Sequence, residues 1–226
     1  MDSQTRVRHY FIGNMDNKLL RFNNKKNIVL VDFETENLCL HGDENLAWQA
    51  AMIKSVGGKS IDHKNFYVKW HRELKVSKEA ARITRFSPSE YKKKAIAVED
   101  IFPTIKDWFD NADYILGHNI LGFDVYLIRY MYSYMGEDYM PLMQKIIDTN
   151  CIAKGIKYGI FYKPEEDFLE YQYKIMHTRR KGVRTNLISL GKEFKIEHNY
   201  DKLHDAIVDL ELNLKVWNQL KYQIEL

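Results

Sequence analysis

The string IVLVDFETENL, residues 28–38, constrains the fold more than any other stretch of the chain. Four apolar residues, typical of a buried strand, are followed at once by two acids, Asp32 and Glu34. Because side chains two apart in a strand lie on the same face, we expect the two carboxylates to be neighbours. Ionised acids are seldom buried without a partner, and a divalent cation would satisfy both. The alternative is that the strand simply ends and both acids face water.

Length and composition favour a globular protein. The chain has 226 residues and a net charge of +3, which fits one sizeable domain, with or without extensions. Two cysteines, Cys39 and Cys151, form neither a disulfide framework nor a zinc-binding spacing. We expect a cytoplasmic protein without a membrane partner, since there is neither a signal peptide nor an apolar run of about 20 residues. A composition rich in Lys, Asn, Ile and Tyr favours an A+T-rich genome, such as that of a bacteriophage or a low-GC bacterium.

Hydrophobic periodicity predicts a mixed α/β domain over residues 28–226, preceded by a polar N-terminal extension, residues 1–27. Three strands are expected first, as a meander with a hairpin turn at Gly57-Gly58. Helices and short strands should then alternate. The expected strands are 28–34, 47–58, 60–70, 114–119 and 146–148, and the expected helices are 77–86, 98–111, 123–135, 187–194 and 206–220. Residues 155–184 fit this pattern poorly and are predicted to be an insertion near the site.

Two later strings add polar residues of the same chemical kind. In GHNILGFDVYLI, Asp124 is expected near the start of a helix and Asn119 five positions earlier. Ordinary capping of a helix N-terminus would also explain them. In HDAIVDLELNLKVW, His204 precedes Asp209 by five residues, so we place His204 on the loop that leads into the helix. A surface histidine and a solvated aspartate are the alternative.

The order of these motifs is similar to that of DnaQ-like 3′→5′ exonucleases of the DEDDh group: D-x-E, then N-x(3)-F-D, then H-x(4)-D. The resemblance spans roughly residues 28–222. It implies a ribonuclease H-like fold, with a central mixed sheet of about five strands, the first three antiparallel, flanked by helices. IIDTN at 146–150 and NLISLGKEFKI at 186–196 resemble secondary motifs of the same family.

The resemblance implies a catalytic site made of Asp32, Glu34, Asp124, His204 and Asp209. The four carboxylates would hold two Mg²⁺ or Mn²⁺ ions, which prefer oxygen ligands. Asp32 would bridge the two ions, Glu34 and Asp209 would hold the ion on the nucleophile side, and Asp124 would help to hold the other. His204 would be the general base that accepts a proton from the attacking water.

The first motif departs from the D-x-E-T-T-G pattern of the family. Glu36 and Asn37 replace small residues at a place where the family's backbone approaches the terminal nucleotide. Glu36 is expected to face solvent, although it could also perturb metal binding. Leu38 matches the apolar position that packs against the terminal base, with plain core packing as the alternative. Thr35 and Asn119 are further expected substrate contacts.

A basic run, KIMHTRRKGVR at 174–184, lies within the predicted insertion. We expect its side chains to contact substrate phosphates, although a solvated charged face is the usual meaning of such a run. The four residues expected to bind are Arg179, Arg180, Lys181 and Arg184. Five aromatic residues nearby could stack on unpaired bases, but a local core is favoured: Tyr158, Phe161, Tyr162, Tyr171 and Tyr173.

The resemblance implies an enzyme that releases nucleoside 5′-monophosphates from single-stranded DNA 3′ ends. An exoribonuclease of the ribonuclease T or oligoribonuclease type is one alternative. A non-catalytic nucleic-acid-binding module associated with a polymerase is another. A proofreading role would require a polymerase or another replication or repair protein as a partner, which residues 1–27 could dock.

Overall fold

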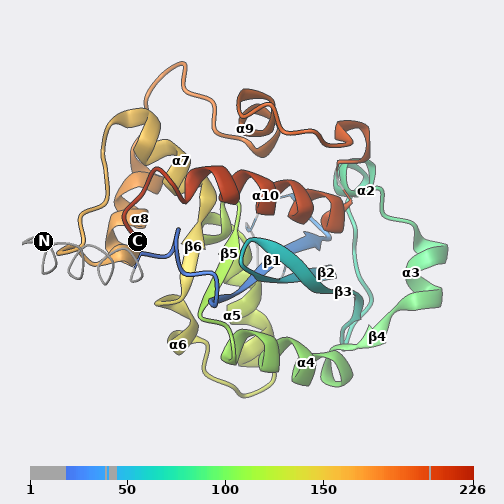
Figure 1. The fold of residues 1–226 in the computed structure, drawn as a ribbon. Helices are drawn as coiled ribbons and strands as arrows, with labels where there is room; N and C mark the ends of the chain where they lie inside the picture. The colour runs from blue at the N-terminus through green and yellow to red at the C-terminus, as the bar shows by residue number, and fades with distance from the viewer. Residues whose placement is uncertain (1–18, 39, 41–44, 204) are drawn as a thin grey trace, which may run out of the picture.

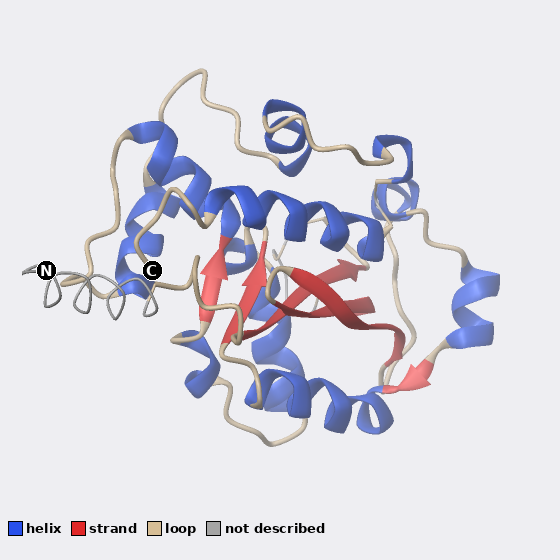
Figure 2. Cartoon of the chain, viewed as in Figure 1, coloured by secondary structure: helices blue, strands red, loops and turns tan. Residues whose placement is uncertain are grey.

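A mixed six-stranded sheet lies at the centre of the molecule, and helices cover both of its faces (Figures 1 and 2). The computed structural model describes residues 19–38, 40, 45–203 and 205–226. The strand order is β4-β3-β2-β1-β5-β6. The first three strands form an antiparallel meander: β1 (Asn27–Thr35), β2 (Ala47–Val56) and β3 (Lys59–Lys69). The other strands are parallel to their neighbours: β4 (Ile96–Ala97), β5 (Tyr114–Gly117) and β6 (Ile146–Asp148).

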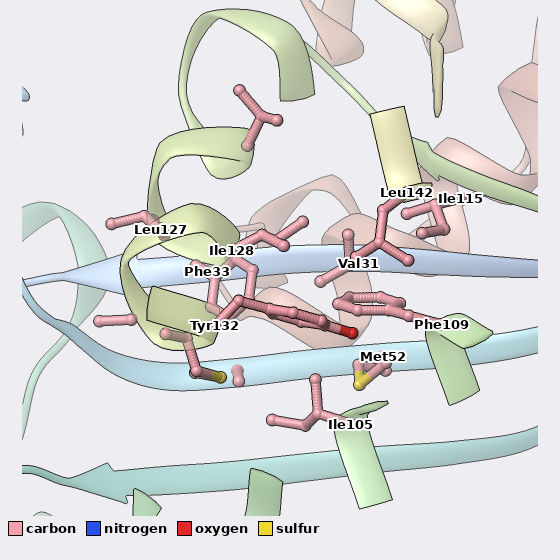
Figure 3. Packing of buried hydrophobic residues seen from close by; sticks show 14 of the residues in the cluster. Val31, Phe33, Met52, Ile105, Phe109, Ile115, Leu127, Ile128, Tyr132 and Leu142 are labelled. Atoms are coloured by element: carbon pink, nitrogen blue, oxygen red, sulfur yellow. The ribbon is translucent and has the colours of Figure 1, made fainter. Parts of the chain in front are cut away.

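The central strand β1 is apolar on both faces, which explains its uninterrupted hydrophobic run. Val29, Val31 and Phe33 pack with two helices, α4 (Val98–Asp110) and α5 (Asp124–Tyr134). Figure 3 shows this side of the core, where Val31 and Met52 of the sheet lie beside Ile105, Phe109, Ile128 and Tyr132 of the helices. The intervening residues Ile28 and Leu30 belong to the core on the other face.

The opposite face of the sheet is covered by α10 (Ala206–Leu220), which lies across β1 and β2 (Figure 1). Leu210, Leu214 and Trp217 of α10 are buried, as their spacing predicts. Because Asp32 and Glu34 continue the Ile28 and Leu30 side of β1, both acids lie on the face that α10 covers.

Helix α8 closes the edge of the sheet at β6. It spans Phe168–His177 and packs against α7 (Thr149–Tyr158). The buried Gln172 accepts a hydrogen bond from the backbone N–H of Asp148 at 2.6 Å and donates one to the carbonyl of Ile146 at 2.9 Å. The side chain of Gln172 thereby satisfies backbone groups of the edge strand β6 that a further strand would otherwise bind.

The predicted strands and the antiparallel order of the first three are confirmed. The sheet has one strand more than expected, because the two residues of β4 pair with the end of β3. Neither α7 nor α8 was predicted. Several shorter helices were not predicted either: α3 (Pro88–Lys94), α6 (Met140–Met143), η1 (Ile120–Gly122) and η2 (Tyr200–Lys202). The predicted helices near 77–86 and 187–194 are α2 (Lys78–Thr84) and α9 (Leu187–Glu193).

Residues 155–184, predicted as an insertion, contain the end of α7 and all of α8, so they contribute to the core. The predicted local core of aromatics is largely present: Tyr158 and Tyr171 are buried and Tyr162 is half-buried, whereas Phe161 is exposed. Of the predicted extension, residues 1–18 lie outside the described residues, as does Cys39. In the described part of the chain, no helix has the length and apolarity needed to cross a bilayer.

Candidate active site

Three of the predicted metal ligands converge where the end of β1 meets the start of α10. One carboxylate oxygen each of Asp32, Glu34 and Asp209 lies within 4.8 Å of the other two. The two strand acids share one face of β1, and Asp209 approaches from the first turn of α10. All three residues are half-buried.

Asp124 reaches the same strand from the other side of the sheet. It is the first residue of α5, and its Oδ1 accepts a hydrogen bond from the backbone N–H of Phe33 at 3.1 Å. Phe33 stands between Asp32 and Glu34, so this bond fixes α5 to the strand position that carries the acids. The sequence separates the four carboxylates by up to 177 positions, and the fold brings them to one strand end.

The pKa values of Asp32, Glu34 and Asp124 are all raised, because the carboxylates are buried close to one another. Burial, followed by repulsion from Glu34 and then from Asp124 and Asp209, raises the pKa of Asp32 well above its usual range. Burial and repulsion from Asp209 and Asp124 raise the pKa of Glu34 to about 8. Burial also raises the pKa of Asp124 to about 7, against the hydrogen bond from Phe33 that lowers it. Desolvated carboxylates that repel one another are stabilised by a cation.

The donor set fits a hard divalent cation. Carboxylate oxygens of three residues on two elements, β1 and α10, surround a common point, and Mg²⁺ and Mn²⁺ prefer oxygen ligands of this kind. No cysteine or described histidine belongs to the cluster, so its chemistry does not favour a thiolate or imidazole metal site. The residues present therefore fit the expected metal.

A second buried acid organises the loop that carries Asn119. Asp148, at the end of β6, accepts hydrogen bonds from the backbone N–H groups of Asn119 at 3.0 Å and Leu121 at 3.2 Å. It also accepts from Asn150 and Cys151 at the start of α7. The sequence pattern marks Asp148 only as a secondary motif, although an acid that ends a buried strand is the same signal that singled out Asp32. Its structural role is to position the loop before Asp124.

His204, the predicted general base, lies outside the described residues. The adjacent Asp205 is exposed and caps α10, with its Oδ1 accepting from the N–H of Ile207 at 3.1 Å. Asp205 also contributes to the raised pKa of Glu34. It was missed at the level of sequence, where capping residues and site residues look alike.

The expectation that Glu36 faces solvent is wrong. Only 1% of the residue is exposed, and its carboxylate pairs with Arg72. Burial would raise the pKa of Glu36, but hydrogen bonds from Arg72 and from the backbone N–H groups of Lys75 and Leu46 outweigh it and lower that pKa. The sequence does not predict the contact between Glu36 and Arg72, because it forms only when the segment after β3 packs against the end of β1.

The expected substrate contacts near the first motif differ in exposure. Leu38 is 43% exposed, which excludes plain core packing and leaves contact with a base as the prediction. Thr35 is buried, and its hydroxyl donates to the carbonyl of Asn37. Asn119 is half-buried and adopts a left-handed conformation at the turn before η1, with φ 66°. Contacts of these three residues with substrate stay predictions.

Asn119 also lines an open basic groove of about 630 Å³ between the loop before α5 and the segment after α8. Three of the four predicted basic residues line this groove, and Lys154 of α7 adds a fourth positive charge. None of its described lining residues is acidic. They are Asn119, Gly122, Lys154, Tyr158, Met176, Thr178, Arg179, Arg180, Lys181 and Val183.

The four predicted basic residues are not equivalent. Arg179 and Lys181 are exposed in the groove. The guanidinium of Arg180 donates to the carbonyl of Tyr158 at 2.7 Å and lies 5.1 Å from the centre of its ring, so it also has a structural role. Arg184 is exposed but does not line the groove, and its carbonyl accepts from Lys157 at 2.8 Å.

Comparison with solved structures supports the ribonuclease H-like fold. The chain is similar to E. coli exonuclease I in complex with a dA16 oligonucleotide, with 20% identity and a TM-score of 0.68. Similar values hold for a zinc-ion-bound E. coli ExoI–ssDNA complex (20%, 0.68) and for an ExoI/SSB-Ct complex (20%, 0.67). Each comparison covers 88% of this chain but 41% of the exonuclease I chain. A search of curated protein sequences found no match.

The predicted resemblance to DnaQ-like exonucleases is confirmed by a match of the sequence to a protein-family model. The family model described as the RNase T exonuclease matches residues 29–217. That range begins within β1 and ends within α10, and it includes all five residues predicted to be catalytic. By this match the chain belongs to the RNase T exonuclease family.

Proposed function

We propose that the protein is a metal-dependent 3′→5′ exonuclease that releases nucleoside 5′-monophosphates from single-stranded DNA. The observation that carries the proposal is the convergence of Asp32, Glu34 and Asp209 within 4.8 Å, with Asp124 bonded to the same strand. Acids placed in this way raise one another's pKa values, which is typical of a functional site rather than of a stabilising cluster.

The proposed mechanism assigns a role to each side chain. Asp32, Glu34, Asp209 and Asp124 would hold two ions of Mg²⁺ or Mn²⁺. When bound, such ions activate a water and stabilise the charge that develops on the phosphate and the leaving 3′ oxygen. His204, which lies outside the described residues, would accept the proton of the water. Leu38 would contact the terminal base, and Thr35 and Asn119 the terminal nucleotide.

Single-stranded DNA is the proposed substrate because the loop that leads into Asp124 also lines the basic groove. Gly122, which lines the groove, is two residues from Asp124, and three exposed or half-exposed cations follow: Lys154, Arg179 and Lys181. A strand whose 3′ end enters the acidic cluster would place its next phosphates among these cations. Two of the similar exonuclease I structures are complexes with single-stranded DNA. A polymerase or repair protein as partner stays a prediction.

The test uses single-stranded DNA and RNA oligonucleotides labelled at the 5′ end, incubated with Mg²⁺, with Mn²⁺ or with EDTA. A 3′→5′ enzyme produces a ladder of progressively shorter labelled strands, whereas a 5′→3′ enzyme releases the label at once as a mononucleotide. The Asp32→Ala, Glu34→Ala double variant should be inactive, and Asp100→Ala, which removes an exposed acid on α4, should match the wild type. Faster degradation of RNA would replace the DNA substrate in the proposal. Intact strands in every lane would overturn it.

A further inference from the structure

Glu36 stands two residues after Glu34 and departs from the D-x-E-T-T-G pattern. A glutamate is costly in a buried position, because an ionised carboxylate loses its hydration there and must find donors. The residue is nevertheless 1% exposed. The chain therefore holds a buried charge beside its candidate active site, at a position where small residues suffice in the family pattern.

The carboxylate of Glu36 accepts four hydrogen bonds. Oε1 accepts from Arg72 Nη2 at 2.5 Å and from the N–H of Leu46 at 3.2 Å. Oε2 accepts from the N–H of Lys75 at 2.7 Å and from Arg72 Nη1 at 3.1 Å. The backbone of Glu36 adds two more bonds, donating to the carbonyl of Leu46 and accepting from the N–H of Ser77. One residue thus joins the end of β1 to the start of β2 and to residues 72–77.

The turn that follows β1 is held by its own side chains. The hydroxyl of Thr35 donates to the carbonyl of Asn37. The side chain of Asn45 accepts from the N–H of Asn37 and donates to its carbonyl, both at 3.0 Å. Beyond this pair Leu38 is 43% exposed. Residues 35–38 therefore form a rigid turn that ends in an exposed apolar side chain next to the acids.

We propose that Glu36 and Arg72 form a clamp that positions residues 35–38 to grip the terminal nucleotide. The inference rests on the proposed function and adds a positioning pair to it. Arg72 presents two parallel N–H donors to both oxygens of Glu36, a geometry that fixes orientation as well as distance. The pair holds residues 35–38 from outside the turn, and its bonds involve neither Asp32 nor Glu34.

Glu36→Gln tests the clamp with little change in shape. All four partners of the carboxylate are donors, and a glutamine offers one acceptor oxygen together with an NH₂ group that donates. The variant cannot keep the four bonds. Glu137→Gln is the matched control. Glu137 is exposed, its Oε2 lies 3.6 Å from Lys106 Nζ, and it follows the C-terminal end of α5, whereas Asp124 is at the N-terminal end.

Three quantities should be measured: amide hydrogen exchange at Leu46, Lys75 and Ser77, the Kd for a single-stranded oligonucleotide in EDTA, and KM with kcat in Mg²⁺. The clamp predicts faster exchange at these amides in Glu36→Gln, and a rise in Kd and KM on the order of tenfold with little change in kcat. The control should match the wild type in all three.

Each other outcome has one meaning. Unchanged exchange at the three amides in Glu36→Gln would overturn the clamp, whatever the enzyme's activity. Faster exchange with unchanged Kd and KM would overturn the role of the clamp in gripping the nucleotide. A fall in kcat alone would also overturn it, and would mean that Glu36 acts on the carboxylate cluster instead. A wild-type protein that neither binds nor cleaves the oligonucleotide would overturn the proposed function and the grip together, while the exchange data would still decide whether the clamp exists.

Discussion

At the scale of single residues, Asp32 shows an opposition between function and stability. Its carboxylate is desolvated and faces three other acids, so its pKa is raised well above the usual range. A side chain that resists ionisation in the folded protein destabilises that protein whenever it is forced to ionise. Cation-binding sites commonly retain such electrostatic repulsion, because the bound ion neutralises the carboxylates.

We predict that Asp32→Asn abolishes activity but does not reduce stability in the absence of metal. The loss of a ligand should lower kcat/KM on the order of 10³-fold, as expected when several kcal/mol of charge stabilisation disappear. In EDTA the Tm should equal or exceed that of the wild type, because the amide removes one repelling charge. Thermal melts with EDTA and with Mg²⁺ would measure this, with Asp100→Asn as the control. A lower Tm in EDTA would contradict the prediction.

At the scale of elements, α8 and the segment after it connect the edge of the sheet to the candidate substrate path. The helix is held at β6 by Gln172, and Met176 near its end already lines the basic groove. The same element therefore has a structural side, which faces the core, and a side that faces the proposed substrate.

Gln172→Leu should destabilise the protein strongly. The substitution leaves the N–H of Asp148 and the carbonyl of Ile146 without their buried partner, which costs about 1–3 kcal/mol for each group. Urea denaturation should show the corresponding fall in the free energy of unfolding. Lys174→Leu, at an exposed position of the same helix, is the control and should change it by less than about 0.5 kcal/mol. Equal effects of the two substitutions would show that the bonds to β6 do not matter.

Arg179→Ala with Lys181→Ala should weaken oligonucleotide binding and make it less sensitive to salt. Each phosphate contact that is lost should reduce the slope of log K against log salt concentration by roughly 0.7 for a single strand. Arg180 is left intact because it also binds the carbonyl of Tyr158. Binding titrations at several salt concentrations measure the slope.

The control for the groove is Lys25→Ala with Lys59→Ala, which removes the same charge at the opposite end of the sheet. It should leave the slope close to that of the wild type. Equal slopes for the wild type and the groove variant would mean that the groove does not bind phosphates.

At the scale of the whole molecule, the carboxylate cluster makes global stability depend on pH and metal. Glu34 has a pKa of about 8 and Asp124 one of about 7 in the folded protein, against ordinary values of 4.5 and 3.8. Between pH 6.5 and 8 the folded protein therefore holds protons that the unfolded chain has already released. Stability falls as pH rises wherever the folded state binds more protons.

We predict that in EDTA the free energy of unfolding decreases from pH 6.5 to 8, by at most about 1.4 kcal/mol per pH unit for each retained proton. Mg²⁺ or Mn²⁺ should reverse the decrease, and the increase in Tm on adding metal should grow with pH, because the ligands must be ionised to bind. Denaturation curves at each pH would measure both effects. Glu34→Gln should flatten the dependence, and a wild-type stability that rises across this range would contradict the assignment.

Periodicity and motif order were enough to predict β1, β2, β3, β5 and β6, the helices α4, α5 and α10, and the family's motifs, but not α7 and α8. These features are local: periodicity reports which side of a strand or helix is buried, and D-x-E after an apolar run places two acids on one face. The motif order also indicated the family, which the match over residues 29–217 confirms.

Which polar residues meet depends on how the chain folds back on itself. The burial of Glu36 against Arg72, the bonds from Gln172 to β6 and the bonds from the N–H groups of Asn119 and Leu121 to Asp148 join segments that lie far apart in the chain. A polar residue has no periodic signature, and whether it is solvated or buried depends on whether a partner reaches it. For Glu36 that partner lies 36 residues away, which is why its sequence neighbourhood suggested solvent and the fold placed it in the interior.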